Sequence, residues 1–234
     1  MSTLLEHLPA LLDDDPSVAA VLGRRTASLA VAEPARAMVL ASLVRRTGRT
    51  PLVVAVPTGT EAERLANDLR LFLGDLPSGR SAVELFPAWE TLPFERISPG
   101  VETMGRRLRA LHRLASIDDR PLVVVASGRA LVQRLGPGAG RIDPVRIGPG
   151  DTVDQQALVA DLVAVGYRRE YQVEHRGELS VRGSIIDVWP STDDAPVRID
   201  LWGDEVERLT EFGVADQRAT VSRAEVELHP CREL

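Results

Sequence analysis

The sequence contains no lysine, so all 28 of its cationic side chains are arginines. This absence excludes the P-loop class of phosphate sites, which needs a lysine ammonium at the phosphates and a Ser or Thr hydroxyl for magnesium. The stretch LAVAEPARAMVL, residues 29–40, stands where such a loop is expected, and it also lacks glycine and hydroxyl side chains. Glu33 in this stretch would repel phosphate. We therefore predict that the chain binds no nucleotide cofactor.

Cysteine, histidine and long apolar runs are also scarce. Cys231 is the lone cysteine, which excludes a disulfide framework and predicts a cytoplasmic protein. The four histidines (His7, His112, His175 and His229) lack metal-ligand spacing, so we expect no metal site. No apolar run approaches the ~20 residues of a membrane span, and no basic segment of a signal peptide opens the sequence. We therefore expect no membrane association.

The charge balance excludes a further class of protein. The formal net charge is −6. A module whose main task is to bind phosphate backbones is usually basic, so this chain is not expected to be a primary DNA clamp. A local basic patch is still compatible with this balance. The G-x-S-x-G elbow of a serine hydrolase is missing, and we predict no catalytic residue.

Strand-like and helix-like segments alternate in the first half of the chain. Strands are expected at 26–32, 51–56, 81–86 and 121–127, and the apolar run of 51–56 is typical of a strand buried on both faces. Helices are expected from Pro34 to Gly48, at 60–75, and at 101–115 with its arginines facing outward. This alternation predicts an α/β lobe with a parallel sheet.

The segment WETLPFERISPG, residues 89–100, interrupts this alternation. We expect Trp89, Leu92 and Phe94 to pack in the core of the lobe, with the prolines shaping the turns. The segment is therefore interpreted as structural.

Glycine and proline cluster at 136–151, which predicts a linker between two domains. The second half then reads as a helix at 151–166 followed by strands. These strands are expected at roughly 169–175, 178–189, 196–202, 205–213 and 223–229. The pattern predicts a small α+β domain with an antiparallel sheet. We place the two domains at 1–140 and 141–234.

The strand-like segment VRIDLW, residues 197–202, carries an unusual outward face. Its aliphatic residues alternate with Arg198, Asp200 and Trp202, and a plain solvent face rarely includes a tryptophan. One interpretation is a docking face, because Arg and Trp are enriched at interface hot spots. The alternative is that Trp202 packs over the sheet edge while Arg198 forms a surface ion pair with Asp200 or Glu178.

Three stretches of the chain resemble a known family. LFPAWETLPFERISPGVETMGRRLRALHRL (85–114) is similar to a signature of the bacterial transcription-repair coupling factors. GYRREYQVEHRGELSVRGSIIDVWP (166–190) and PVRIDLWGDEVERLTEFGVADQRAT (196–220) resemble their second domain, which the excision-repair protein UvrB shares. The resemblance covers about residues 50–230. It implies a degenerate helicase-type lobe, UvrB-like domain 1a, followed by UvrB-like domain 2.

The resemblance also implies where chemistry is absent. UvrB keeps a P-loop and a DNA-clasping β-hairpin in its first lobe, whereas this chain lacks the P-loop and is too short at residues 86–106 for the hairpin. Members of the coupling-factor family are longer and continue into an RNA-polymerase-binding domain and an ATP-driven translocase on double-stranded DNA. ATP and magnesium are thus expected only in that motor, and RNA polymerase and DNA are expected partners of downstream domains.

The second domain of both families binds UvrA, the damage-recognition ATPase. The resemblance implies UvrA contacts for Arg182, Arg198 and Trp202. Arg168 and Arg169 are weaker candidates, and Asp200 lies on the same strand face as Arg198. Ser180 stands where UvrB has another arginine, so one contact of the UvrB type is in doubt.

Two functions follow as hypotheses. The first is a monomeric, non-catalytic module that recruits UvrA to RNA polymerase stalled at a lesion, which would couple transcription to nucleotide excision repair. The alternative is a UvrB-like helicase or nuclease acting on damaged DNA with ATP. The missing lysine, the missing hairpin and the acidic charge disfavour the alternative. ATP hydrolysis, or salt-sensitive binding to a DNA bubble, would support it.

Overall fold

The computed structural model describes residues 4–92, 94–95, 97–136, 138–139 and 142–233. Two compact units are present, one formed by 1–88 with 113–133 and the other by 89–112 with 134–234. The sequence predicts a domain boundary between residues 140 and 141. Because domains need not coincide with compact units, this boundary stays a prediction. None of the helices in the described ranges has the length and hydrophobicity of a membrane span.

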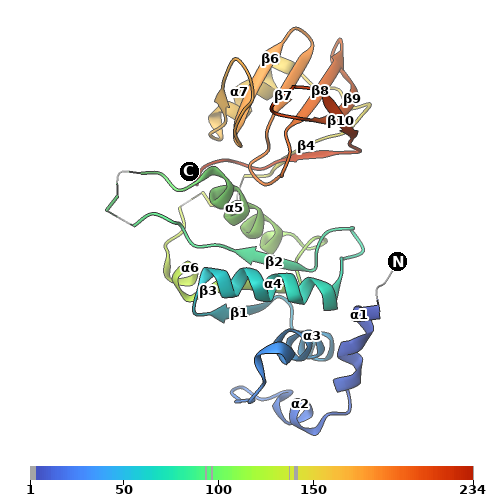
Figure 1. Cartoon of the computed structure of the whole chain (residues 1–234), viewed down its shortest axis with the longest axis vertical. Helices are drawn as coiled ribbons and strands as arrows, with labels where there is room; N and C mark the ends of the chain where they lie inside the picture. Colours follow the sequence, from blue (N-terminus) through green and yellow to red (C-terminus); the bar gives the residue numbers. More distant parts are fainter. Residues whose placement is uncertain (1–3, 93, 96, 137, 140–141, 234) are drawn as a thin grey trace. The chain divides into compact units, whose positions relative to one another are not determined.

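The first unit is built on a parallel sheet of three strands in the order β1-β3-β2 (Figure 1). The strands are β1 (Leu52–Val56), β2 (Val83–Phe86) and β3 (Val123–Ser127). The helical elements are α1 (Leu4–His7), η1 (Leu8–Leu12), α2 (Pro16–Val21), η2 (Glu33–Ala35), α3 (Arg36–Thr47), α4 (Gly59–Leu73) and α6 (Gly128–Val132). Apolar residues of α3, α4 and the sheet form one core. The predicted α/β lobe with a parallel sheet is confirmed.

Two expectations for this unit are wrong. The predicted strand at 26–32 is absent, and η2 and α3 follow this segment directly. The burial of β1 alternates along the strand and Val53 is 53% exposed, so β1 is covered on one face and not on both. The predicted end of this helix is confirmed. Gly48 is the C-cap of α3, and its left-handed backbone (φ 58°) favours glycine.

Helix α5 (Val101–Ala115) lies where the sequence predicts it, but two of its arginines face inward. Arg107 is fully buried and donates from Nε to Glu233 at 2.6 Å, within the second unit. Arg113 is buried in the first unit and donates to Glu84 at 2.6 Å and to the carbonyl of Ser81. The expectation that the arginines face outward is thus wrong for these two, because each has a carboxylate that offsets the cost of burying its charge.

The second unit contains a sheet of six strands in the order β10-β9-β8-β7-β6-β5 (Figure 1). The strands are β5 (Arg168–Arg169), β6 (Glu178–Arg182), β7 (Ile185–Val188), β8 (Val197–Trp202), β9 (Glu205–Phe212) and β10 (Ala219–Ser222). All neighbours are antiparallel except β5 and β6. The predicted antiparallel sheet is confirmed, although residues 170–175 are not a strand, the predicted strand 178–189 is two strands separated by a turn at Gly183, and β10 was missed.

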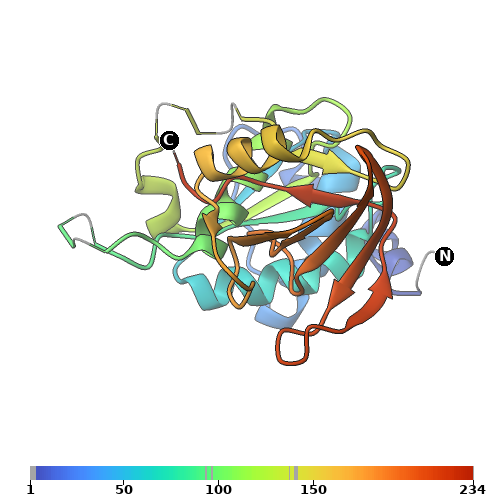
Figure 2. The ribbon, with the colours of Figure 1, turned by 90° about the horizontal axis from the view of Figure 1, so that it is seen from above.

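One face of this sheet packs against α7 (Gln155–Ala164), which lies on one side of the six strands (Figure 2). Asp154 caps α7 by accepting from the backbone N–H groups of Gln156 and Ala157. The predicted linker is only partly irregular, since it contains β4 (Val145–Ile147), which pairs with β11 (Val226–Leu228). This pairing brings together residues near the two ends of segment 134–234, which is the larger part of the second unit.

Gly105 marks the closest approach of α5 to the rest of the second unit. A Cβ atom at this position would lie 2.3 Å from Ser191 Oγ and 2.5 Å from Ser191 Cβ. We expect Gly105→Ala to lower the free energy of unfolding of this unit by about 1–3 kcal/mol, because the helix must move to relieve the overlap.

Tryptophan fluorescence during denaturant unfolding measures this effect selectively, because all three tryptophans belong to the second unit: Trp89, Trp189 and Trp202. Gly59→Ala is the matched control, since a Cβ there meets no atom within 4 Å. Equal unfolding midpoints for Gly105→Ala and the parent chain would contradict the assigned packing.

Candidate functional site

Strand β8 separates an aliphatic face from a polar one. Val197, Ile199 and Leu201 are buried in the core of the second unit, as the alternation predicts. Arg198, Asp200 and Trp202 therefore point to the opposite face of the sheet. The candidate site lies on this outer face, whose organisation depends on the neighbouring strands.

The antiparallel register aligns the outer-face residues in rows across the strands. One row contains Ser180, Asp187, Arg198 and Thr210. The next row contains Arg182, Ile185, Asp200 and Arg208. Directly opposite residues in such rows have adjacent side chains, so each row brings charges of opposite sign together.

The Asp187 carboxylate is the centre of the first row. It is 1% exposed, and Arg198 donates to it twice, from Nε to Oδ1 at 2.7 Å and from Nη2 to Oδ2 at 3.0 Å. The Arg198 guanidinium also donates to the Gln217 carbonyl at 3.3 Å and lies 4.9 Å from the Phe212 ring centre. The hydrogen bonds with Asp187 raise the pKa of Arg198 above the usual value of an arginine. Arg198 is therefore held firmly, and its side chain is only 17% exposed.

The pairing expected for Arg198 with Asp200 or Glu178 is wrong. Asp187 takes that role because it lies directly opposite Arg198 on β7. Asp200 instead accepts two hydrogen bonds from Arg208, at 3.0 Å from Nε and 2.9 Å from Nη2. Glu178 accepts from Arg168 and from the backbone N–H groups of Glu174 and His175. Cross-strand register, rather than sequence separation, determines each pair.

Arg182 and Trp202 lie at the end of the sheet where two tight turns meet solvent. Arg182 donates to Asp187 from Nη2, yet its side chain is 46% exposed. Trp202 is 79% exposed. Gly183 and Gly203 open the two turns with positive φ, and Gly183 has no side chain that could cover the indole. The alternative interpretation, in which Trp202 packs over the sheet edge, is therefore wrong.

Loops cover the other end of the outer face. Val173 is fully buried there, and the Gln217 side chain donates to the carbonyls of Val173 and Val214. The Ser180 hydroxyl donates to the Tyr171 carbonyl, so it is also removed from solvent. The exposed part of the face is consequently the turn end. We name it the turn-end patch and define it as Arg182, Asp200, Trp202 and Arg208.

Arg168 and Arg169 lie apart from the turn-end patch. Both are on β5, and Arg168 is in register with Glu178, four residues before Arg182 on β6. At about 3.3 Å per residue this separates the two positions by roughly 13 Å along the sheet. Of the six predicted contact residues, the structure brings together Arg182, Arg198, Asp200 and Trp202.

Arg208 is a member of the patch that sequence reasoning missed. Its side chain is 62% exposed and pairs with Asp200. A hairpin register drawn through the Gly203-Asp204 turn would have placed Arg208 near Asp200, but a bulge between Asp200 and Leu201 shifts that register. The sequence therefore indicates that Arg208 lies near Asp200, but it does not predict that the two residues are directly opposite each other.

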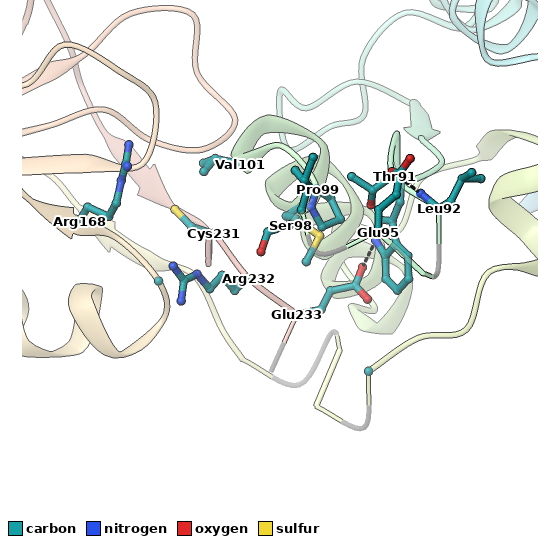
Figure 3. Close-up of a pocket in the computed structure, with 15 residues that line it drawn as sticks. Thr91, Leu92, Glu95, Ser98, Pro99, Val101, Arg168, Cys231, Arg232 and Glu233 are labelled. Carbon is teal, nitrogen blue, oxygen red and sulfur yellow. Dashed lines mark hydrogen bonds between the residues drawn. The ribbon is translucent and has the colours of Figure 1, made fainter.

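The segment 89–100 differs from its predicted role. Phe94 is 95% exposed and Leu92 is 56% exposed, so neither packs in a core. The segment instead borders a cavity of about 520 Å³ within the second unit, together with Arg168, Cys231 and Glu233 (Figure 3). No group of three His, Cys, Asp or Glu side chains in the described ranges is arranged to hold a metal ion.

The comparison with known proteins agrees with this architecture. Residues 145–234 match the family described as the UvrB interaction domain. The second unit thus contains an interaction domain of the UvrB type. The turn-end patch lies on this domain.

The chain belongs to the family of transcription-repair-coupling factors, whose amino-terminal region it matches. It is 44% identical over 223 residues to the coupling factor of Mycobacterium tuberculosis (strain CDC 1551 / Oshkosh), which covers 91% of this chain and 17% of that protein. For the Myxococcus xanthus protein the identity is 36%, with 91% and 18% covered. For the Escherichia coli (strain K12) protein it is 29%, with 78% and 15% covered. The chain therefore spans less than a fifth of these relatives.

The two arginine–aspartate pairs of the outer face predict different stability effects. Arg198→Ala leaves the buried Asp187 carboxylate with one partner, and we expect a loss of about 3 kcal/mol in the free energy of unfolding. Arg208→Ala removes an exposed pair and should cost less than about 1 kcal/mol. Denaturant unfolding followed by tryptophan fluorescence compares the two variants. Equal losses would contradict the structural role assigned to Asp187.

The single cysteine provides a probe of the same unit. Cys231 is 2% exposed, and burial raises the pKa of its thiol to about 12. The reactive thiolate is then on the order of one molecule in 10⁴ at pH 8. We expect a thiol reagent to label the folded chain very slowly and the chain in denaturant rapidly. Rapid labelling of the folded chain would show that Cys231 is accessible.

Proposed function

We propose that the second unit is a docking module for UvrA and that it has no catalysis of its own. The exposure of Trp202 is the observation that carries this proposal. A large indole left in solvent on the same sheet face as the exposed arginines Arg182 and Arg208 has the composition of an interface hot spot, in which an aromatic anchor and arginines lose water together. The homology with the coupling factors supports UvrA as the partner, since that contact is what their resemblance to UvrB implies.

The charge distribution of the patch indicates what kind of surface the partner offers. Arg182 and Arg208 lie in the row of Asp200, next to the end of β8 that carries Trp202, and each is paired on only part of its guanidinium. Arginine offers up to five N–H donors, so each of them retains donors for a carboxylate. We therefore propose that UvrA contributes acidic side chains around an apolar pocket for Trp202.

The wider role follows as part of the same proposal. A module that captures UvrA would recruit it to RNA polymerase stalled at a lesion and so link transcription to nucleotide excision repair. We assign the contacts with RNA polymerase and double-stranded DNA, and the use of ATP and magnesium, to other parts of the longer proteins. The module would act as a single copy in the cytoplasm.

The test is the double variant Arg182→Glu with Trp202→Ala. Both side chains are exposed at the turn end, so the fold should persist, whereas loss of an aromatic anchor alone often costs about 2–4 kcal/mol of binding. We expect affinity for purified UvrA to fall by at least about 100-fold, measured by titration calorimetry. Arg198→Glu is a poorer test, because Arg198 is mostly covered and donates two hydrogen bonds to the buried Asp187, whereas Arg182 donates one and its half-exposed side chain can turn toward solvent when it is replaced.

Arg36→Glu is the matched control for charge reversal. Arg36 is exposed at the first position of α3 in the first unit, where an acidic residue is favourable to the helix dipole. This variant should bind UvrA like the parent chain. Undiminished binding by a double variant with a native circular dichroism spectrum would refute the docking role of the patch.

A further inference from the structure

The docking proposal assigns no role to the buried Asp187 carboxylate. It lies on the outer face of β7 and is 1% exposed, so it cannot itself reach a partner. Nevertheless it binds both Arg198 and Arg182. A carboxylate removed from water needs such partners, because its desolvation is costly unless cations and hydrogen bonds replace the lost water.

The two arginines depend on Asp187 to different extents. Arg198 has further support from the Gln217 carbonyl and the Phe212 ring. Among the described residues, Arg182 is held by Asp187 alone. Loss of the carboxylate would therefore leave Arg198 largely in place and release Arg182.

The location of Arg182 makes this dependence relevant to docking. Arg182 shares a row with Ile185 and Asp200, and Trp202 follows two residues after Asp200 on the same face. A free arginine side chain at this site would have to be ordered when a partner binds, which costs conformational entropy. An arginine already fixed by Asp187 avoids most of that cost.

The cluster also keeps a net positive charge. Two guanidiniums share one carboxylate, so the group formed by Arg182, Asp187 and Arg198 carries one excess cation. That excess charge faces solvent through Arg182, whose side chain is about half exposed, whereas Arg198 is mostly covered. An acidic group of the partner would therefore meet a fixed cation on the same face of the sheet as the indole.

We propose that Asp187 is the positioning residue of the UvrA-docking face, because it fixes the half-exposed Arg182 guanidinium on the outer face of the sheet before the partner arrives. The proposal rests on the proposed function of the second unit. It extends that function to a buried residue that makes no contact with the partner and acts through Arg182.

Asp187→Asn tests this role with little change of shape. The amide keeps one acceptor oxygen, which Arg198 retains, and places an N–H₂ group where Arg182 needs an acceptor. We expect affinity for UvrA to fall about tenfold, measured by titration calorimetry. Asp161→Asn is the matched control, because Asp161 is exposed on α7, which packs on the opposite face of the sheet. It should bind like the parent chain.

A double-variant cycle separates positioning from general destabilisation. If Asp187 acts through Arg182, Asp187→Asn should have almost no further effect in an Arg182→Ala background, so the double variant loses about tenfold rather than about 100-fold. Additive losses would overturn the proposal. If Asp187→Asn does not fold, Asp187→Asn with Arg198→Gln removes one anion and one cation together, and the same cycle with Arg182→Ala is measured on that chain.

A spectroscopic measurement reports on Arg182 without UvrA. The ¹⁵Nε resonance of Arg182 should show slow rotation of the guanidinium in the parent chain and fast rotation in Asp187→Asn, while that of Arg198 stays slow. Unchanged rotation of Arg182 would overturn the proposal. If the Arg182→Glu/Trp202→Ala chain binds UvrA normally, the proposed function fails instead, and this resonance still decides whether Asp187 positions Arg182.

Discussion

The outer face of the second unit depends on one buried carboxylate. Asp187 is enclosed at the centre of the six-stranded sheet, where an unpaired charge would destabilise the fold by several kcal/mol. Arg198 supplies the permanent partner from the next strand, and Phe212 and Gln217 fix that arginine in turn. With the first row of the face fixed in this way, the neighbouring row and the two turns can remain exposed without loss of structure.

Helix α5 also contains arginines that are buried against carboxylates. Arg107 is fully buried against Glu233, and Arg113 is buried against Glu84. A chain that has arginine as its sole cationic residue meets each buried carboxylate with a planar group of five N–H donors. Charged residues are therefore part of the interior of both units, which the usual rule that arginines face solvent does not anticipate.

The sequence was informative where local rules decide the structure. The glycine stop of α3 and the alternation of β8 follow from backbone sterics or from side-chain period, and each lies where it was expected. The expectations that failed depended on distant neighbours. Residues 26–32 read as a strand but have no pairing partner, and Phe94 is apolar but is not covered by any core.

The sequence by itself determined that the chain has no P-loop lysine, that a parallel α/β lobe precedes an antiparallel sheet, and that Arg198, Asp200 and Trp202 share one strand face. These properties depend on composition and on a period of two residues, both of which are local. The tertiary structure alone decided that Asp187 is the partner of Arg198, that Arg208 pairs with Asp200, and that Arg168 lies apart from the turn-end patch. The reason is that strand register and loop cover, which bring residues from distant segments together, set which charges are buried and which side chains remain free.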